Sequence, residues 1–248
     1  MFAIPSILYV ARKRHLYDDL GHFRKEHDQG IPRLGGVAMF VSFTITVLMF
    51  SVASKQLPIN CLITACIILL AVGLKDDLHG VNPGNKFLMQ FVLAVVVVVC
   101  GDIRLTSLYG IMGVGQLNYA VSVLTSIFAI ILVINAFNLI DGIDGLAATL
   151  GIMANCIFAA FFTYLHQYHM AAICLAMVGS IFGFLKYNIT PAKLFMGDTG
   201  SLLTGLISVI MGIELVKYNG PEYAGGDNQW FSAPALVIAV FILSLIHI

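Results

Sequence analysis

Long apolar runs separated by short polar segments make up most of the chain. About 20 apolar residues in a helix cross the hydrocarbon core of a bilayer, and about eight of the runs approach that length. They cover approximately residues 34–53, 57–74, 87–100, 119–135, 146–165, 170–187, 202–216 and 233–248. Residues 1–10 are also apolar but too few to span, as expected of a truncated first helix. The pattern predicts an all-α fold, a polytopic transmembrane helical bundle of about eight spans plus that truncated first helix.

Composition agrees with a membrane protein and excludes two other classes. Of the 248 residues, 59% are hydrophobic and 10% are charged, whereas a soluble domain carries about 25% charged residues. A soluble core could not bury so much apolar surface. The formal net charge is zero, which argues against nucleic acid as a partner. No segment of the sequence resembles a separate soluble domain, so residues 1–248 are expected to form a single integral membrane domain.

Basic residues predict how the bundle is oriented. If the polar segments alternate between the two sides of the membrane, ten lysines and arginines fall on one side and three on the other. Cytoplasmic loops are enriched in these residues, so the side with ten is expected to face the cytoplasm. Three separate loops bring five carboxylates to that side: Asp76, Asp77, Asp141, Asp144 and Asp198. This gathering of acids is the strongest indication of a functional site.

The stretch NAFNLIDGIDGL lies between two of the apolar runs. Its polar residues, Asn135, Asn138, Asp141 and Asp144, are spaced three apart. Over the nine residues from first to last, an ideal helix turns by about 180° relative to the starting direction. One straight helix therefore cannot aim all four side chains at one point. We predict that a helix ends near Asn138, that a tight loop with two glycines follows, and that its oxygen atoms converge on a cation.

Asp198, in the segment MGDTGS, permits two interpretations. Its carboxylate could cap a helix that starts near Thr199, or the N-terminus of that helix could bind phosphate. Asn138, Asp141 and Asp198 are hard oxygen ligands, which suit magnesium or manganese better than zinc.

Two further features also have alternatives. Asp76 and Asp77 close a helix, where the negative end of the helix dipole disfavours carboxylates. They are either solvated loop acids offset by Lys75, or an acid pair held near a cation or a proton donor. Phe195 either packs in the protein or stacks on a base beside a phosphate site.

Four motifs carry a resemblance to a known family: FRKEHDQGIPRLGG, GLKDDLHG, NAFNLIDGIDGLA and KLFMGDTGS. The chain resembles the polyprenyl-phosphate N-acetylhexosamine-1-phosphate transferases, the MraY/WecA-like glycosyltransferase family 4. These integral membrane enzymes transfer a sugar 1-phosphate from a UDP-sugar to a polyprenyl phosphate and release UMP. The resemblance implies that residues 1–248 are one transferase domain, incomplete at both ends, because the family has a full first helix and continues into a histidine-containing loop.

The resemblance also implies a role for each motif residue. Asp198 and Asn138 occupy the positions of Mg²⁺ ligands, with Mn²⁺ as an alternative. The catalytic positions are four acids and a lysine, namely Asp76, Asp77, Asp141, Asp144 and Lys86. Among these, Asp76 would deprotonate the lipid phosphate with Asp77 in support, and Lys86 would contact substrate phosphate. The substrate-binding positions are Asn135, Asn188 and Phe195, of which Phe195 would stack on uracil.

The same resemblance implies a substrate and a location. The form IPRLGG favours a UDP-N-acetylhexosamine such as UDP-GlcNAc over the pentapeptide substrate of peptidoglycan synthesis. We expect transfer to undecaprenyl phosphate as the first membrane step of O-antigen or related cell-envelope glycan synthesis. The expected location is the bacterial inner (plasma) membrane, with a cytoplasmic active site, and a homodimer is a further expectation.

Three alternatives differ in substrate or class. The first is the phospho-MurNAc-pentapeptide transferase. The second is an ion-coupled transporter, which would place its ionisable residues near mid-membrane and show repeated halves, neither of which the sequence shows. The third is an intramembrane aspartyl protease, which needs the motif Gly-x-Gly-Asp, whereas position 195 is a phenylalanine.

Overall fold

The computed structural model describes residues 3–14, 31–50, 58–110, 113–189, 191–219 and 233–245. Within those ranges the chain is helical, apart from loops and one isolated bridge between Ser107 and Gln116. The helices are α1 (Ala3–Arg14), α2 (Gly35–Phe50), α3 (Ile59–His79), α4 (Pro83–Val95), the π-helix η1 (Val96–Cys100), α5 (Tyr119–Ile140), α6 (Leu146–Tyr164), α7 (Tyr168–Asn188), α8 (Gly197–Lys217) and α9 (Ala233–Leu245). The predicted all-α fold is confirmed.

Six helical segments of the described chain are long and apolar enough to cross a membrane: α3, α4 with η1, α5, α6, α7 and α8. The two other predicted runs correspond to α2, a shorter apolar helix of 16 residues, and α9, of 13 residues. Helix α1 has 12 residues and matches the expected short first helix. The protein is therefore a polytopic helical membrane protein.

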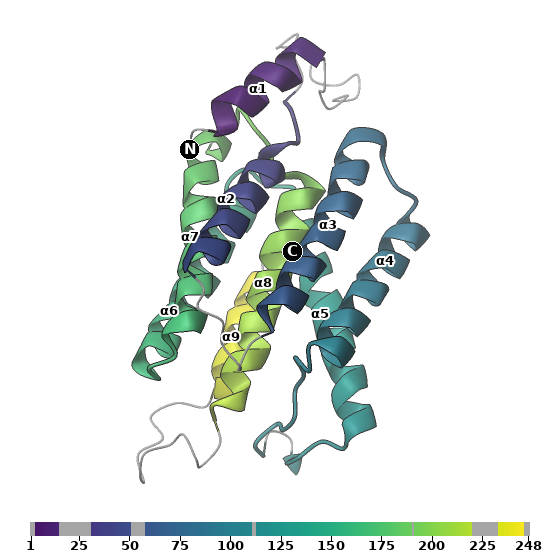
Figure 1. Ribbon diagram of the computed structural model, residues 1–248, viewed down its shortest axis with the longest axis vertical. Helices are drawn as coiled ribbons and strands as arrows, with labels where there is room; N and C mark the ends of the chain where they lie inside the picture. The colour runs from purple at the N-terminus through teal and green to yellow at the C-terminus, as the bar shows by residue number, and fades with distance from the viewer. Residues whose placement is uncertain are drawn as a thin grey trace.

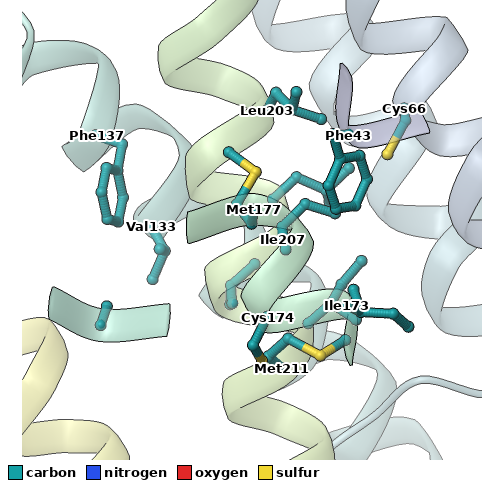
Figure 2. Close-up of a cluster of buried hydrophobic side chains, with 14 of the residues drawn as sticks. Phe43, Cys66, Val133, Phe137, Ile173, Cys174, Met177, Leu203, Ile207 and Met211 are labelled. Carbon is teal, nitrogen blue, oxygen red and sulfur yellow. The ribbon is translucent and has the colours of Figure 1, made fainter. Parts of the chain in front are cut away.

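Helix α8 lies at the centre of the bundle (Figure 1). Every residue of its 18-residue apolar stretch is buried, and the helix packs against α2, α3, α5, α6, α7 and α9. Its face at Leu203, Ile207 and Met211 lies near Phe43 of α2 and Met177 of α7 in a continuous hydrophobic cluster (Figure 2). These six helices thus surround α8 and separate it from lipid.

Small residues allow α8 to approach its neighbours closely. A Cβ added at Gly36 of α2 would overlap the backbone of Gly200, and one at Gly73 of α3 would lie 2.6 Å from the Cα of Thr199. Membrane helices associate through such close packing, because lipid is as apolar as the side chains it would replace. The small residues therefore hold the N-terminal turn of α8 between α2 and α3.

One end of the bundle gathers all the predicted acids. Helices α3, α5 and α7 end there, while α4, α6 and α8 begin there, at the upper end in Figure 1. We name this the site end. Helix α4 begins at Pro83, which is suited to the first helical position. Its N-cap, Asn82, accepts a hydrogen bond from the N–H of Gly84 at 3.0 Å.

We predict that Gly36→Ala destabilises the protein by about 1–3 kcal/mol, because the added methyl group forces α2 away from α8. The measurement is the thermal unfolding midpoint of the detergent-solubilised protein. Gly179→Ala on α7 is the matched control, since nothing lies within 4 Å of a Cβ at that position. Equal midpoints for the two variants would contradict the close packing of α2 on α8.

Candidate active site

The N-terminus of α8 is capped by a carboxylate from another helix. Residue Met196 at the N-cap position offers no side-chain hydrogen bond. Instead, Asp77 of α3 accepts hydrogen bonds from the backbone N–H of Asp198 at 2.7 Å and of Thr199 at 3.1 Å. The hydroxyl of Thr199 also donates to it, at 2.7 Å. Asp77 thus satisfies N–H groups that an α-helix leaves unpaired and places a negative charge at the positive end of the helix dipole.

The backbone at the start of α8 is shaped to receive this cap. Gly197 has a φ of +69°, which favours glycine, and a Cβ there would lie 2.6 Å from an oxygen of Asp77. On the opposite side, the N–H groups of Gly35 and Gly36 donate to the carbonyl oxygens of Phe195 at 3.0 Å and Met196 at 2.8 Å. The segment before α8 is therefore tied to both α2 and α3.

The side chain of Asp198 is free of the capping role. It accepts a hydrogen bond from the amide of Asn138 on α5 at 2.7 Å and forms an ion pair with Lys86 of α4. Asn138 also donates to the hydroxyl of Ser201 at 3.1 Å. The interpretation that Asp198 caps the helix is therefore wrong, because Asp77 holds the first N–H groups and Asp198 faces α4 and α5.

Lys86 joins three of the predicted residues. Its ammonium group lies 3.0 Å from a carboxylate oxygen of Asp76 and 3.4 Å from the amide oxygen of Asn138, and it pairs with Asp198. The other oxygen of Asp76 accepts the backbone N–H of Val81 at 2.6 Å, which fixes the turn between α3 and α4. The side chains of Lys86, Asp76 and Asp198 are 16–23% exposed, so the cluster is accessible from one side.

Asp141 is a half-buried acid at the same end of the bundle. It follows the last residue of α5 and accepts a hydrogen bond from the N–H of Gly197. Burial, together with the nearby charges of Asp77 and Asp198, raises the pKa of Asp141 to about 8. These negative charges close together favour the presence of a cation. Asp144 is exposed in the following loop.

The structure places the three predicted substrate-binding residues in different surroundings. Asn188 is buried, and its amide accepts the N–H of Gly145 and donates to the carbonyl of Leu194 at 3.1 Å, so it joins two loops of the site end. Phe195 is half-buried. Asn135 lies on α5, which continues as a helix to Ile140, two residues past the predicted end near Asn138.

Asn135 does not converge on the Lys86 cluster as the loop prediction required. Its amide forms a pair with Gln90 of α4, with distances of 2.8 Å and 3.4 Å. Sequence reasoning missed Gln90, Thr199 and Ser201. The signal for Gln90 was its position, since it is an amide in an apolar run four residues after Lys86 and thus on the same helix face.

The donor set suits a hard cation. Oxygen atoms of Asp76, Asp198 and Asn138 already surround the positive charge of Lys86. Carboxylate and amide oxygens are the ligands of magnesium, which takes one or two protein carboxylates and completes its shell with water and phosphate. Among the described residues, no three His, Cys, Asp or Glu side chains form a metal cluster. The residues therefore fit magnesium shared with a phosphate, and not a closed structural metal site.

Fold and site together define a polytopic membrane protein with an acidic, lysine-containing site at one end of its central helix. The motifs and this arrangement agree with a direct comparison to protein families. The model for glycosyl transferase family 4 matches residues 59–216. The chain belongs to this family.

Individual relatives cover most of the chain. It is 36% identical over 243 residues to a decaprenyl-phosphate N-acetylglucosaminephosphotransferase of Mycolicibacterium smegmatis, a match that spans 89% of this chain and 59% of the relative. It is 33% identical over 218 residues to a probable undecaprenyl-phosphate N-acetylglucosaminyl 1-phosphate transferase of Bacillus subtilis, over 86% of this chain and 59% of the relative.

A relative of another kind matches a smaller part of the chain. It is the phospho-N-acetylmuramoyl-pentapeptide-transferase of Rubrobacter xylanophilus, 35% identical over 195 residues, which span 71% of this chain and 58% of that protein. The chain thus spans about three fifths of the length of these relatives.

We predict that Asp77→Ala lowers the free energy of unfolding by about 1–2 kcal/mol, the usual cost of removing a helix N-cap. Asp77→Asn should cost less, because an amide oxygen can still accept one N–H. Thermal unfolding midpoints measure both, with Lys75→Ala as the control because Lys75 is an exposed neighbour on the same helix. If Asp77→Ala unfolds at the same temperature as Lys75→Ala, the cap does not stabilise α8.

Proposed function

We propose that the protein transfers N-acetylglucosamine 1-phosphate from UDP-GlcNAc to undecaprenyl phosphate and releases UMP. The observation that carries the proposal is the convergence of Asp76, Lys86, Asn138 and Asp198 at the N-terminus of the central membrane helix. A site at the end of a membrane helix can receive the phosphate of a lipid while the lipid tail stays in the bilayer. The names of two relatives support transfer of acetylglucosamine phosphate to a polyprenyl phosphate, and the name of the Bacillus subtilis relative supports undecaprenyl phosphate as that acceptor.

The chain's own residues supply positioning, charge and a proton acceptor. An oxygen of the lipid phosphate attacks the phosphorus that bears the sugar, and the bond from that phosphorus to the UMP oxygen breaks. Lys86 binds phosphate oxygens through its ammonium group and offsets their negative charge. Asp76, 3.0 Å from Lys86, is the acceptor of a proton from a protonated lipid phosphate.

Asp198 and Asn138 are the residues that would hold a magnesium ion, with manganese as the alternative. When bound, the cation neutralises charge on the pyrophosphate of the UDP-sugar as UMP leaves. Asn138 is oriented for this role by its hydrogen bonds to Asp198 and Ser201. Asp141 and Asp144 complete the acidic surroundings, and Asp77 and Asn188 hold the loops on which the other residues lie.

In the proposed orientation, the protein lies in the inner membrane of a bacterial cell and its site end faces the cytoplasm. It rests on the ten-to-three distribution of basic residues. UDP-sugars are cytoplasmic metabolites, so this orientation gives the site access to its donor. A homodimer stays a prediction that nothing in the described contacts tests.

Two other functions lead to different products. A pentapeptide transferase, supported by the relative from Rubrobacter xylanophilus, would use UDP-MurNAc-pentapeptide in place of UDP-GlcNAc. A transporter would leave both substrates chemically unchanged. The deciding experiment incubates membranes carrying the full-length protein with each labelled UDP-sugar and undecaprenyl phosphate. UMP release and a GlcNAc-pyrophosphoryl lipid are expected only from UDP-GlcNAc, whereas a MurNAc-pentapeptide lipid or an absence of UMP would overturn the proposal.

We predict that Asp198→Asn reduces turnover at least tenfold, or by about 1.4 kcal/mol of transition-state stabilisation, because a neutral amide is a poor replacement for a metal-binding carboxylate. UMP release is measured over a range of magnesium concentrations. Asp102→Asn, at the opposite end of the bundle, is the control, and asparagine tolerates its positive φ of 48°. Normal turnover of Asp198→Asn with unchanged magnesium dependence would exclude the metal-binding role.

We predict that Phe195→Ala raises KM for UDP-GlcNAc more than KM for undecaprenyl phosphate, because stacking of a base on an aromatic ring contributes about 1–3 kcal/mol. Phe182→Ala on α7 is the matched control, since that ring is 63% exposed on the outer surface. If both variants keep the wild-type KM for UDP-GlcNAc, Phe195 serves only in packing.

A further inference from the structure

Gln90 is a buried amide on a helix that is otherwise largely exposed. Its neighbours Phe87, Leu88 and Phe91 are 54%, 57% and 42% exposed, whereas Gln90 is 1% exposed. On α4, only Gln90, Leu93 and Ala94 are buried. The one strongly polar side chain of this apolar stretch therefore points into the protein, where it lies against α5.

We propose that Gln90 and Asn135 form an amide clasp that positions Lys86 and Asn138 for the transfer reaction. The inference rests on the proposed function, since it assigns a role in that reaction to two residues outside the Lys86 cluster. Gln90 is here a positioning residue that acts through Lys86 and does not itself contact substrate.

The clasp is reciprocal. The amide N–H₂ of Asn135 donates to the side-chain oxygen of Gln90 at 2.8 Å, and the N–H₂ of Gln90 lies 3.4 Å from the side-chain oxygen of Asn135. Asn135 donates as well to the carbonyl of Ile131 on its own helix, at 2.8 Å. An amide buried without partners is costly, so the two side chains stabilise each other only while α4 and α5 keep this alignment.

The clasp lies one helical turn from the Lys86 cluster. Lys86 and Gln90 are four residues apart on α4, and Asn135 and Asn138 are three apart on α5, so each pair shares a helix face. The Lys86–Asn138 contact at 3.4 Å and the Gln90–Asn135 pair are therefore two successive connections between the same two helices. A shift of α4 by one residue would turn Lys86 by about 100° and move it by about 1.5 Å.

Apolar packing alone would not prevent such a shift. Few apolar side chains of α4 pack inside the protein, since only Leu93 and Ala94 are buried besides Gln90, so packing does little to fix its register. The Gln90–Asn135 pair does select one register, because in a slipped helix the buried amide of Gln90 loses its partner on α5. Gln90 and the ion pairs of Lys86 together hold α4 in this register.

The first measurement compares two variants of the full-length protein with the wild type by UMP release. For Gln90→Leu, which keeps the volume and removes the amide, we expect kcat to fall about tenfold or more, because misplacement of a group by about 1 Å has effects of this size. KM for UDP-GlcNAc should stay within about twofold, because the hydrogen bond between Asn138 on α5 and Asp198 on α8 does not involve α4. The matched control is Asn155→Leu, which removes a buried amide that bonds Ser208 at 2.9 Å between α6 and α8; its kcat should remain near wild type.

An exchange of the two residues provides the second measurement. Gln90→Asn shortens one arm of the clasp and should lower kcat, and adding Asn135→Gln should restore most of it by lengthening the other arm. This second measurement is informative even if Gln90→Leu does not fold. Wild-type kcat in both Gln90→Leu and Gln90→Asn, a kcat in Asn155→Leu as low as in Gln90→Leu, or a double variant with a kcat below that of Gln90→Asn would each overturn the clasp.

The proposed function and the clasp fail in distinguishable ways. If the wild-type protein releases no UMP from UDP-GlcNAc in the presence of undecaprenyl phosphate, the function is wrong. If the wild-type protein is active and Asp198→Asn is not, but the Gln90 variants behave as wild type, the function stands and only the clasp is excluded.

Discussion

The cap that Asp77 provides for α8 is the interaction on which the rest of the site depends. Three hydrogen bonds join one carboxylate of α3 to the first turn of the central helix. Because the cap comes from a different helix, the carboxylate of Asp198 is available to Lys86 and Asn138. If Asp198 itself had capped α8, its carboxylate would have accepted the N–H groups of its own helix and would not have faced α4 and α5.

The site is built from short connections between helix ends, so that each helix contributes one or two groups. Helix α3 supplies Asp76 and Asp77, α4 supplies Lys86, α5 supplies Asn138, and α8 supplies Asp198. Excess negative charge is held close to one lysine, and the high pKa of Asp141 follows from its burial and, secondly, from the same crowding. Such a concentration of charge is unfavourable by itself, and it is suited to a substrate that brings phosphate together with a divalent cation.

Hydropathy predicted the helices, and the side of the membrane expected for each loop predicted that the acids gather at one end, whereas the role of Lys86 came from the family resemblance. The runs of apolar residues correspond to α2–α9, and four of the predicted residues, Asp76, Lys86, Asn138 and Asp198, do meet. The three-residue spacing predicted the same role for Asn135 and Asn138, although Asn135 faces Gln90 and Asn138 faces Asp198. The capping of α8 by Asp77 could not be predicted from local sequence patterns, because it joins residues 121 positions apart in the chain.

The helices that carry the site differ in how much of their surface is exposed to lipid. All residues in the 18-residue apolar stretch of α8 are buried, whereas only 28% of the residues in the corresponding stretch of α4 and η1 are buried. A change in bilayer thickness or acyl-chain order therefore cannot act on α8 directly, since tilting in response to mismatch requires contact with lipid. It acts on the least buried spans, α4, which carries Lys86, and α3, which is 33% buried and carries Asp76. The dependence of the protein on its membrane thus enters through these outer helices, while the helix that bears Asp198 is mechanically shielded.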